Sequence, residues 1–249
     1  MSAMISTELP SRQRSLVLGA AVSCAASAAI LGGAMAQSGA PTGWWWLHWI
    51  AKPLATVLVL ALACFAAAPI SRRYQAWVAA GIVCSLIGDV LLMLPQNLFV
   101  AGLVAFLCGH ACFIAAFLND SGLAVRPSAW LACLLVGGAN LYLLWPSIPP
   151  ALHVPVAVYG LLLSSMGGLA VARAWFHAAM ADRLALPARR AALGGVLFML
   201  SDSLLAWDRF HAALPLATLW ILGSYYAALW FIARSVMGGE TTKTASAMS

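Results

Sequence analysis

The chain alternates between long apolar runs and short polar connections. Eight runs approach the roughly 20 residues that a helix needs to cross the apolar part of a bilayer. They cover residues 16–36, 44–68, 75–94, 98–118, 127–145, 152–175, 190–210 and 215–236. The connections are rich in Pro, Gly, Asn and charged residues, which favour turns and loops. The pattern predicts an all-α protein, a polytopic membrane helical bundle with eight transmembrane helices.

The composition points to the same class. Of the 249 residues, 63% are hydrophobic and only 8% are charged, whereas about 25% of the residues of a soluble domain are charged. We expect one transmembrane domain over residues 16–236. A cytoplasmic segment, 1–15, would precede it, and a polar, disordered cytoplasmic tail, 237–249, would follow it. The six cysteines lie within apolar runs without a C-x-x-C pair, which is typical of packing residues.

The basic residues predict the orientation of the helices. With the N-terminus inside, 11 of the 13 Lys and Arg residues fall on the inner side, which is the side that such residues prefer. The prediction is therefore N-in and C-in, in the inner membrane of a bacterium. The net charge of +6 is spread over several connections and not gathered in one patch, so we expect membrane lipids as surroundings and no nucleic-acid partner.

The first apolar run has a second interpretation. Two arginines precede it, and Ala34-Met35-Ala36 near its end resembles a signal-peptidase site. Cleavage there would leave seven spans with the same orientation. Retention is the favoured interpretation, because the run is long enough to span a bilayer.

Ionisable side chains inside the apolar runs are few, and each comes from a different predicted helix. A carboxylate at mid-bilayer costs about 3 kcal/mol on insertion scales, so such residues face the protein interior. A rise of ~1.5 Å per residue places these side chains roughly 9 to 18 Å below the outer surface. They are Lys52, Asp89, His110 and Asp202. Their similar depths predict a shared polar cavity.

Two carboxylates in one dry cavity suit acid/base chemistry. One carboxyl group would act as a general acid while the other acts as a base toward water, and either Asp89 or Asp202 could be the acid. Ser85 lies one helical turn before Asp89, and Ser201 adjoins Asp202, so both serines are candidate supporting groups. The sequence contains no G-x-S-x-G, H-E-x-x-H or P-loop motif. We therefore expect no metal and no cofactor.

Other interpretations of these residues stay open. Lys52 could simply form an ion pair with one Asp, and His110 could be a hydrogen-bonded core residue. The same Asp, Lys and His cluster would also suit a proton-coupled transporter or a lipid flippase. A structural membrane protein would pair both carboxylates and leave no cavity. A blind cavity would favour an enzyme, and a path to both faces would favour a transporter.

The polar positions recur in local motifs. The chain has Lys-Pro in the second run, S-x-x-G-D in the third, G-H-x-x-F-x-x-x-F in the fourth, V-P-V-x-x-Y in the sixth, S-D-x-x-L-A in the seventh and S-Y-Y in the eighth. Together these motifs resemble the YhhN-type lysoplasmalogenase family, from about residue 50 to residue 232. The matching positions include Lys52, Pro53, Ser85, Gly88, Asp89, Gly109, His110, Phe113, Phe117, Tyr159, Ser201, Asp202, Phe210, Tyr225 and Tyr226.

The resemblance implies a function. Members of the family hydrolyse the vinyl-ether bond of lysoplasmalogens and release a fatty aldehyde and a glycerophospho head group. It implies Asp89 and Asp202 as the catalytic pair, a lysophospholipid or related ether lipid as substrate, and Tyr159 and Tyr225 as supporting groups. One departure is Leu229, where the family often has Gln, which implies that a polar cavity group is missing.

Overall fold

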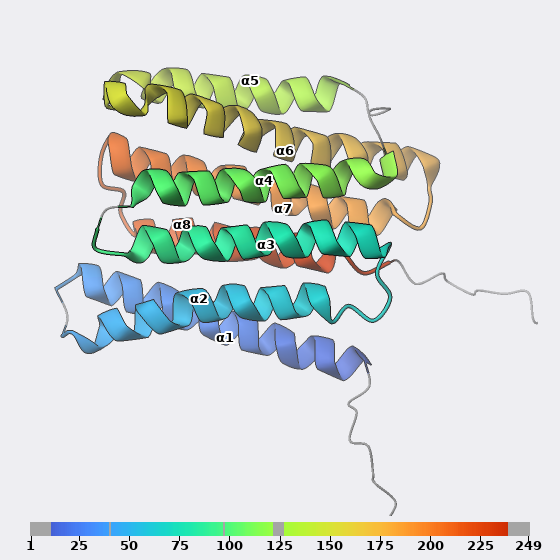
Figure 1. The fold of residues 1–249 in the computed structure, drawn as a ribbon, viewed down its shortest axis with the longest axis horizontal. Helices are drawn as coiled ribbons and strands as arrows, with labels where there is room; N and C mark the ends of the chain where they lie inside the picture. Colours follow the sequence, from blue (N-terminus) through green and yellow to red (C-terminus); the bar gives the residue numbers. More distant parts are fainter. Residues whose placement is uncertain (1–10, 40, 97, 122–126, 239–249) are drawn as a thin grey trace, which may run out of the picture.

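The computed structural model describes residues 11–39, 41–96, 98–121 and 127–238, and these residues form a bundle of α-helices (Figure 1). Two of the predicted segments lie largely outside the described residues. These are the N-terminal segment, of which residues 1–10 are not described, and the tail, of which residues 239–249 are not described. The helices are α1 Ser11–Gln37, α2 Gly43–Cys64, α3 Arg72–Met93, α4 Phe99–Ser121, α5 Pro127–Leu144, α6 His153–Met180, α7 Ala185–Phe210 and α8 Ala217–Arg234. Two short 3₁₀ helices, Trp145–Ser147 and Pro150–Leu152, connect α5 to α6.

The helices lie side by side along one common direction. In the view of Figure 1, α1 and α2 form one edge of the bundle and α5 and α6 form the other, with α3 and α4 in front of α8 and α7. In the described part of the chain, seven helical segments are long and apolar enough to cross a membrane. The remaining helix, α8, has 18 residues, or about 27 Å of length. The prediction of an all-α, polytopic membrane bundle is confirmed.

Several helix ends differ from the prediction by three residues or more, and two of these differences have a physical cause in the structure. Helix α2 ends at Cys64 and not near residue 68, because Pro69 disfavours helix in the residues before it and Gln75 of α3 donates hydrogen bonds to the carbonyls of Ala63 and Cys64. Helix α6 continues to Met180 and not to residue 175. The charge of Arg173 interrupts the apolar pattern, but the side chain is fully buried in the bundle.

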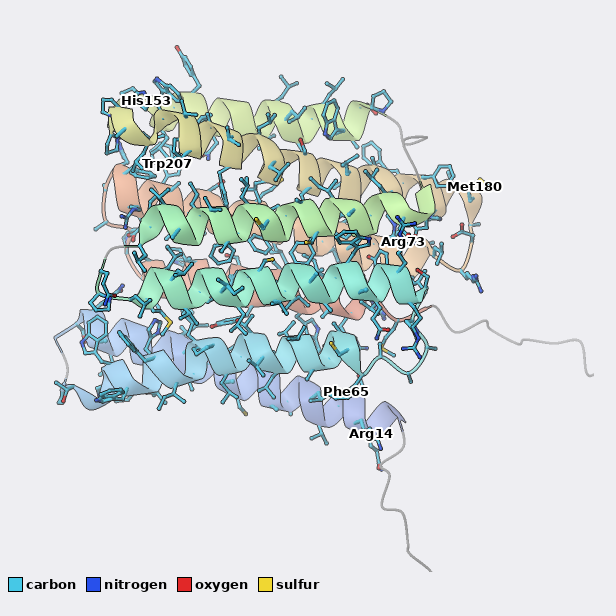
Figure 2. All side chains as sticks on the ribbon, in the orientation of Figure 1. Arg14, Phe65, Arg73, His153, Met180 and Trp207 are labelled. Carbon is cyan, nitrogen blue, oxygen red and sulfur yellow. The ribbon has the colours of Figure 1, made fainter. Side chains whose placement is uncertain are left out.

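The two ends of the bundle differ in charge. Arg14 and Arg73 lie toward the same end, opposite His153 and Trp207 (Figure 2). The end with Arg14 and Arg73 is called the inner end below, following the predicted orientation, and the opposite end is called the outer end.

Helix α1 packs as an integral part of the bundle. At the outer end, the Thr218 hydroxyl of α8 donates a hydrogen bond to the Gln37 side chain of α1 at 2.8 Å. The His48 ring of α2 lies 2.8 Å from the Ala29 carbonyl. These contacts tie the first helix to α2 and α8.

Glycine permits close packing next to the first carboxylate. A Cβ atom on Gly88 would lie 2.6 Å from the ring of Phe106, so the ring would have to move to accommodate a larger residue. Gly88 therefore lets Phe106 of α4 lie against α3, beside Asp89.

Candidate active site

A cavity of about 320 Å³ lies inside the outer half of the bundle. Its wall includes residues from all eight helices, and on each helix they come from the end nearer the outer side. Asp89, Asp202 and Lys52 all line it. The sequence predicts similar depths for four ionisable side chains. Three of them line this one cavity, and the fourth, His110, contacts Tyr159 of the cavity wall from behind.

Asp89 is held by three donors. Thr56 donates to Oδ2 at 2.8 Å, Tyr225 donates to the same oxygen at 2.6 Å, and the Lys52 ammonium lies 3.4 Å from Oδ1. The carboxylate is 2% exposed. Two hydroxyl donors and one adjacent cation suit the acceptor positions of an ionised carboxylate.

Asp202 has a different set of neighbours. The Tyr159 hydroxyl donates a short hydrogen bond to Oδ2 of Asp202. The same hydroxyl lies 3.0 Å from His110 Nε2, and that nitrogen is 3.6 Å from Oδ2. His110, Tyr159 and Asp202 thus form a chain of groups that can pass a proton, with Asp202 at the cavity.

A cluster of aromatic rings connects the neighbours of the two carboxylates. The centre of the Phe198 ring lies 4.8 Å from the centre of the His110 ring and 5.5 Å from that of the Tyr225 ring, and both pairs are edge to face. Phe106 contacts the rings of Phe198 and Tyr225. One side of Phe198 therefore touches a neighbour of Asp202, and another touches the tyrosine that binds Asp89.

The two serines and Leu229 lie in different settings. Ser201 lines the cavity and donates to the Ile221 carbonyl at 3.0 Å. Ser85 is buried outside the cavity wall and donates to the Gly81 carbonyl at 3.0 Å. Leu229 packs in the hydrophobic core away from the cavity, so the implied loss of a polar cavity group at this position is wrong.

Several residues of the site were not predicted. Thr56 lies four residues after Lys52, so helical spacing alone could have placed it on the same face. Phe106 and Phe198 gave no signal, because apolar residues in membrane helices face lipid as often as protein. Asn140 and Trp207 were not predicted either. The Trp207 indole donates to the Asn140 side chain at 2.8 Å and joins α5 to α7 beside the cavity.

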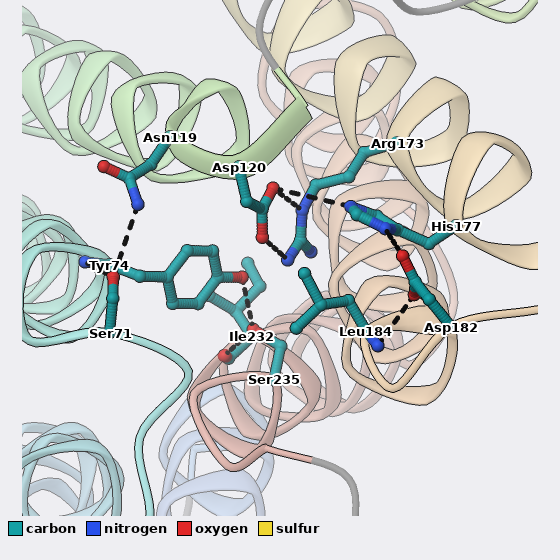
Figure 3. Close-up of polar contacts among 10 residues, drawn as sticks. All are labelled: Ser71, Tyr74, Asn119, Asp120, Arg173, His177, Asp182, Leu184, Ile232 and Ser235. Atoms are coloured by element: carbon teal, nitrogen blue, oxygen red, sulfur yellow. Dashed lines mark hydrogen bonds and ion pairs between the residues drawn. The ribbon is translucent and has the colours of Figure 1, made fainter. Parts of the chain in front are cut away.

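A second polar cluster lies near the inner end (Figure 3). Arg173 of α6 is fully buried and forms a two-pronged ion pair with Asp120 of α4, with Nε 2.7 Å from Oδ1. The guanidinium also lies 5.0 Å above the Tyr74 ring of α3, and the Tyr74 hydroxyl is 2.8 Å from Ser235. This cluster joins α3, α4, α6 and the end of α8 at the side away from the cavity.

The connection from α6 to α7 is attached to this cluster. Asp182 lies 2.8 Å from His177 and accepts the Leu184 backbone N–H. Partial burial raises the pKa of Asp182, but the hydrogen bonds from His177 and Leu184 outweigh it and hold that pKa below its ordinary value. The connection therefore carries a charged hydrogen bond to the helix that precedes it.

The chain matches known proteins over most of its length. The model of the YhhN family matches residues 47–236. The chain is 34% identical over 200 residues to human "Lysoplasmalogenase TMEM86B", covering 80% of both chains. It is 34% identical over 184 residues to "Lysoplasmalogenase" of Mycobacterium tuberculosis (strain CDC 1551 / Oshkosh), covering 70% of this chain and 65% of that relative.

No solved structure matches the chain. The family match begins in α2 and includes every residue described above in contact with Asp89 or Asp202. Since the match also spans three quarters of the sequence, this chain belongs to the YhhN family.

Proposed function

We propose that this protein is an integral membrane hydrolase that cleaves the vinyl-ether bond of lysoplasmalogens, or of a related lysolipid, to a fatty aldehyde and a glycerophospho head group. The observation that carries the proposal is the pair of carboxylates, Asp89 and Asp202, on the wall of one cavity. The relatives named lysoplasmalogenase support the substrate class.

The surroundings of the two carboxylates support separate roles. Lys52 and two hydroxyl donors favour the ionised form of Asp89. Asp202 instead adjoins Tyr159 and His110, which form a hydrogen-bonded chain with it. We therefore assign Asp202 as the general acid and Asp89 as the base and the anion that stabilises positive charge.

The reaction follows from these roles. Asp202 protonates the alkenyl carbon that is not bonded to oxygen, and an oxocarbenium ion forms that the Asp89 carboxylate stabilises. Water adds to the other alkenyl carbon as Asp89 takes its proton. The hemiacetal then collapses: its C–O bond to glycerol breaks, the glycerol oxygen takes the proton from Asp89, and the hemiacetal hydroxyl returns a proton to Asp202. One water is consumed, and both carboxyl groups regain their starting state.

The cavity wall suits a single-chain lipid. Gln37 and Arg209 are polar wall residues at the outer ends of their helices. Leu141 and Leu163 form part of the apolar wall made by α5 and α6. The phosphate of the head group would meet Arg209, whose guanidinium lies 4.0 Å above the Phe99 ring. The alkyl chain would follow α5 and α6 toward lipid.

The position of the cavity favours an enzyme over a transporter. Its lining residues all belong to the outer halves of the helices. Toward the inner end, the fully buried rings of Phe113 and Phe117 and the Asp120–Arg173 pair fill the bundle. A blind cavity suits a substrate that enters and leaves on one side.

The experiment is an aldehyde-release assay on purified protein with a vinyl-ether lysolipid. The wild type should release aldehyde, and Asp89→Asn and Asp202→Asn should each lower kcat at least about 100-fold, the usual scale of acid/base catalysis. Asp182→Asn is the matched control, because this carboxylate lies at the inner end and outside the cavity. An inactive wild type, or full activity in both cavity variants, would refute the proposal.

A further inference from the structure

A second cavity, of about 450 Å³, lies at the inner end between α1, α7 and α8. Its wall includes Ser15 and Gly19 of α1, Arg190 of α7, and Trp230 and Arg234 of α8. Arg190 precedes Asp202 by twelve residues on the same helix, which separates the two levels by about 18 Å. No residue of the catalytic cavity lines this second one.

The cavity contains two guanidinium groups and no acidic side chain. Arg234 Nη1 donates to the Ser15 hydroxyl at 2.5 Å, and Arg190 Nη1 donates to the backbone carbonyl of Arg234 at 3.3 Å. Within the described ranges, neither arginine forms an ion pair with a carboxylate. The two positive charges are close enough to repel each other, so a bound anion would relieve an unfavourable interaction.

The other side of the cavity is apolar and faces the bilayer. Leu16 is 66% exposed, and Trp230 lies against α1 at Gly19, where a Cβ atom would be 2.8 Å from the indole. The Arg234 guanidinium lies 5.8 Å from the Trp230 ring. The cavity thus places a cationic group near the membrane surface and an aromatic ring next to it on the lipid side, an arrangement common at membrane interfaces.

We propose that this cavity binds the phosphate of an anionic phospholipid from the inner leaflet, with one acyl chain packed along Leu16 and Trp230. Guanidinium groups bind phosphate oxygens in pairs of parallel hydrogen bonds, and basic pockets between membrane helices are suited to lipid head groups. The bound lipid would hold α1 against α7 and α8 through Ser15, Arg190 and Arg234. The proposal does not depend on the proposed hydrolysis.

The test is lipid binding by the purified, delipidated full-length protein. Native mass spectrometry and thermal melting would be followed during titration with phosphatidylglycerol, phosphatidylcholine or inorganic phosphate. Wild type should bind phosphatidylglycerol at least tenfold more tightly than phosphatidylcholine and should melt at a higher temperature with it. Arg190→Gln/Arg234→Gln should lose at least tenfold in affinity for phosphatidylglycerol.

Arg72→Gln/Arg73→Gln is the matched control, because it removes two exposed positive charges from the same end without changing the cavity. It should bind phosphatidylglycerol like wild type. The single variant Arg190→Gln, which keeps the contact between Arg234 and Ser15, should show an intermediate loss if the double variant does not fold. Equal binding of both lipids, or an equal loss in the control, would overturn the proposal. If inorganic phosphate bound as tightly as phosphatidylglycerol, the proposed lipid would be refuted and the ligand would be a soluble phosphate compound.

Discussion

At the level of single residues, the two carboxylates of the cavity differ in the groups that contact them. Asp89 has an ammonium group and two hydroxyl donors, whereas Asp202 has one tyrosine and, behind it, a histidine. Each carboxylate therefore has a tyrosine, but the two tyrosines have unequal importance. Tyr225 is one of three partners of Asp89, whereas Tyr159 lies between Asp202 and the His110 ring and contacts both.

Removing each tyrosine hydroxyl should separate these roles. Tyr159→Phe should lower kcat about 10- to 100-fold and change the pH profile of kcat, because Asp202 loses its connection to His110. Tyr225→Phe should lower kcat less than tenfold, since Lys52 and Thr56 still hold Asp89. The measurement is aldehyde release across a range of pH. Equal effects of the two substitutions, with unchanged pH profiles, would contradict the assigned roles.

The ion pair of Lys52 with Asp89 predicts a compensating effect in a double variant. Lys52→Met removes the cation from a carboxylate that is 2% exposed, and losing one partner of a buried pair costs about 3 kcal/mol or more. The melting temperature in detergent should fall clearly. Adding Asp89→Asn should recover most of that loss, because no buried charge is left. A double variant that melts lower than Lys52→Met would show that the pair is not the cause.

At the level of helices, polar contacts hold the bundle together at both ends. At the outer end, Asn140 and Trp207 join α5 to α7, and Gln37 and Thr218 join α1 to α8. At the inner end, the Asp120–Arg173 pair joins α4 to α6. In a bilayer the lipid is as apolar as the helix surfaces, so hydrophobic burial does not select neighbours, and such contacts determine which helices meet.

The inner ion pair should matter for stability and not for catalysis. Arg173→Met leaves Asp120 without its cation and should destabilise the protein by about 3–5 kcal/mol. The fraction that remains folded should keep its kcat, because the pair lies outside the cavity. Asp120→Leu/Arg173→Met should melt at a higher temperature than Arg173→Met alone. Thermal melting and active-fraction kinetics would check both statements, and a large fall in kcat would contradict them.

At the level of the whole molecule, the two proposed sites lie at different depths along the membrane normal. The proposed reaction occurs in the outer half, where residues from all eight helices meet. The buried arginine cluster and the proposed lipid site lie in the inner half. This separation, together with the positive charges at the inner end, predicts that the cavity mouth faces away from the cytoplasm.

Cysteine labelling would check this orientation. In a background without the six free cysteines, Ala212→Cys in the connection from α7 to α8 should react with a membrane-impermeant thiol reagent in intact bacterial cells. Arg183→Cys in the connection from α6 to α7 should react only after the inner membrane is opened. Both positions are exposed, so accessibility to the reagent decides the outcome. The opposite labelling pattern would reverse the predicted orientation.

The sequence by itself determined the class of the protein and the identity of its buried charges. Apolar runs of bilayer length require helices, because only internally hydrogen-bonded segments can span lipid. The cost of burying Lys52, Asp89, His110 and Asp202 made each stand out against an apolar background. The approximate depth of each followed from the fixed rise per residue.

Only the tertiary structure decided which partners those charges have. Helical periodicity places a side chain on a face of its own helix, but neighbours such as Tyr225 and Asp89 are 136 residues apart. The burial of Arg173, the exclusion of Ser85 from the cavity wall and the core position of Leu229 depended on the same information. The physical reason is that an apolar helix face suits lipid and protein equally well, so its neighbour is chosen by packing and hydrogen bonds that no local pattern contains.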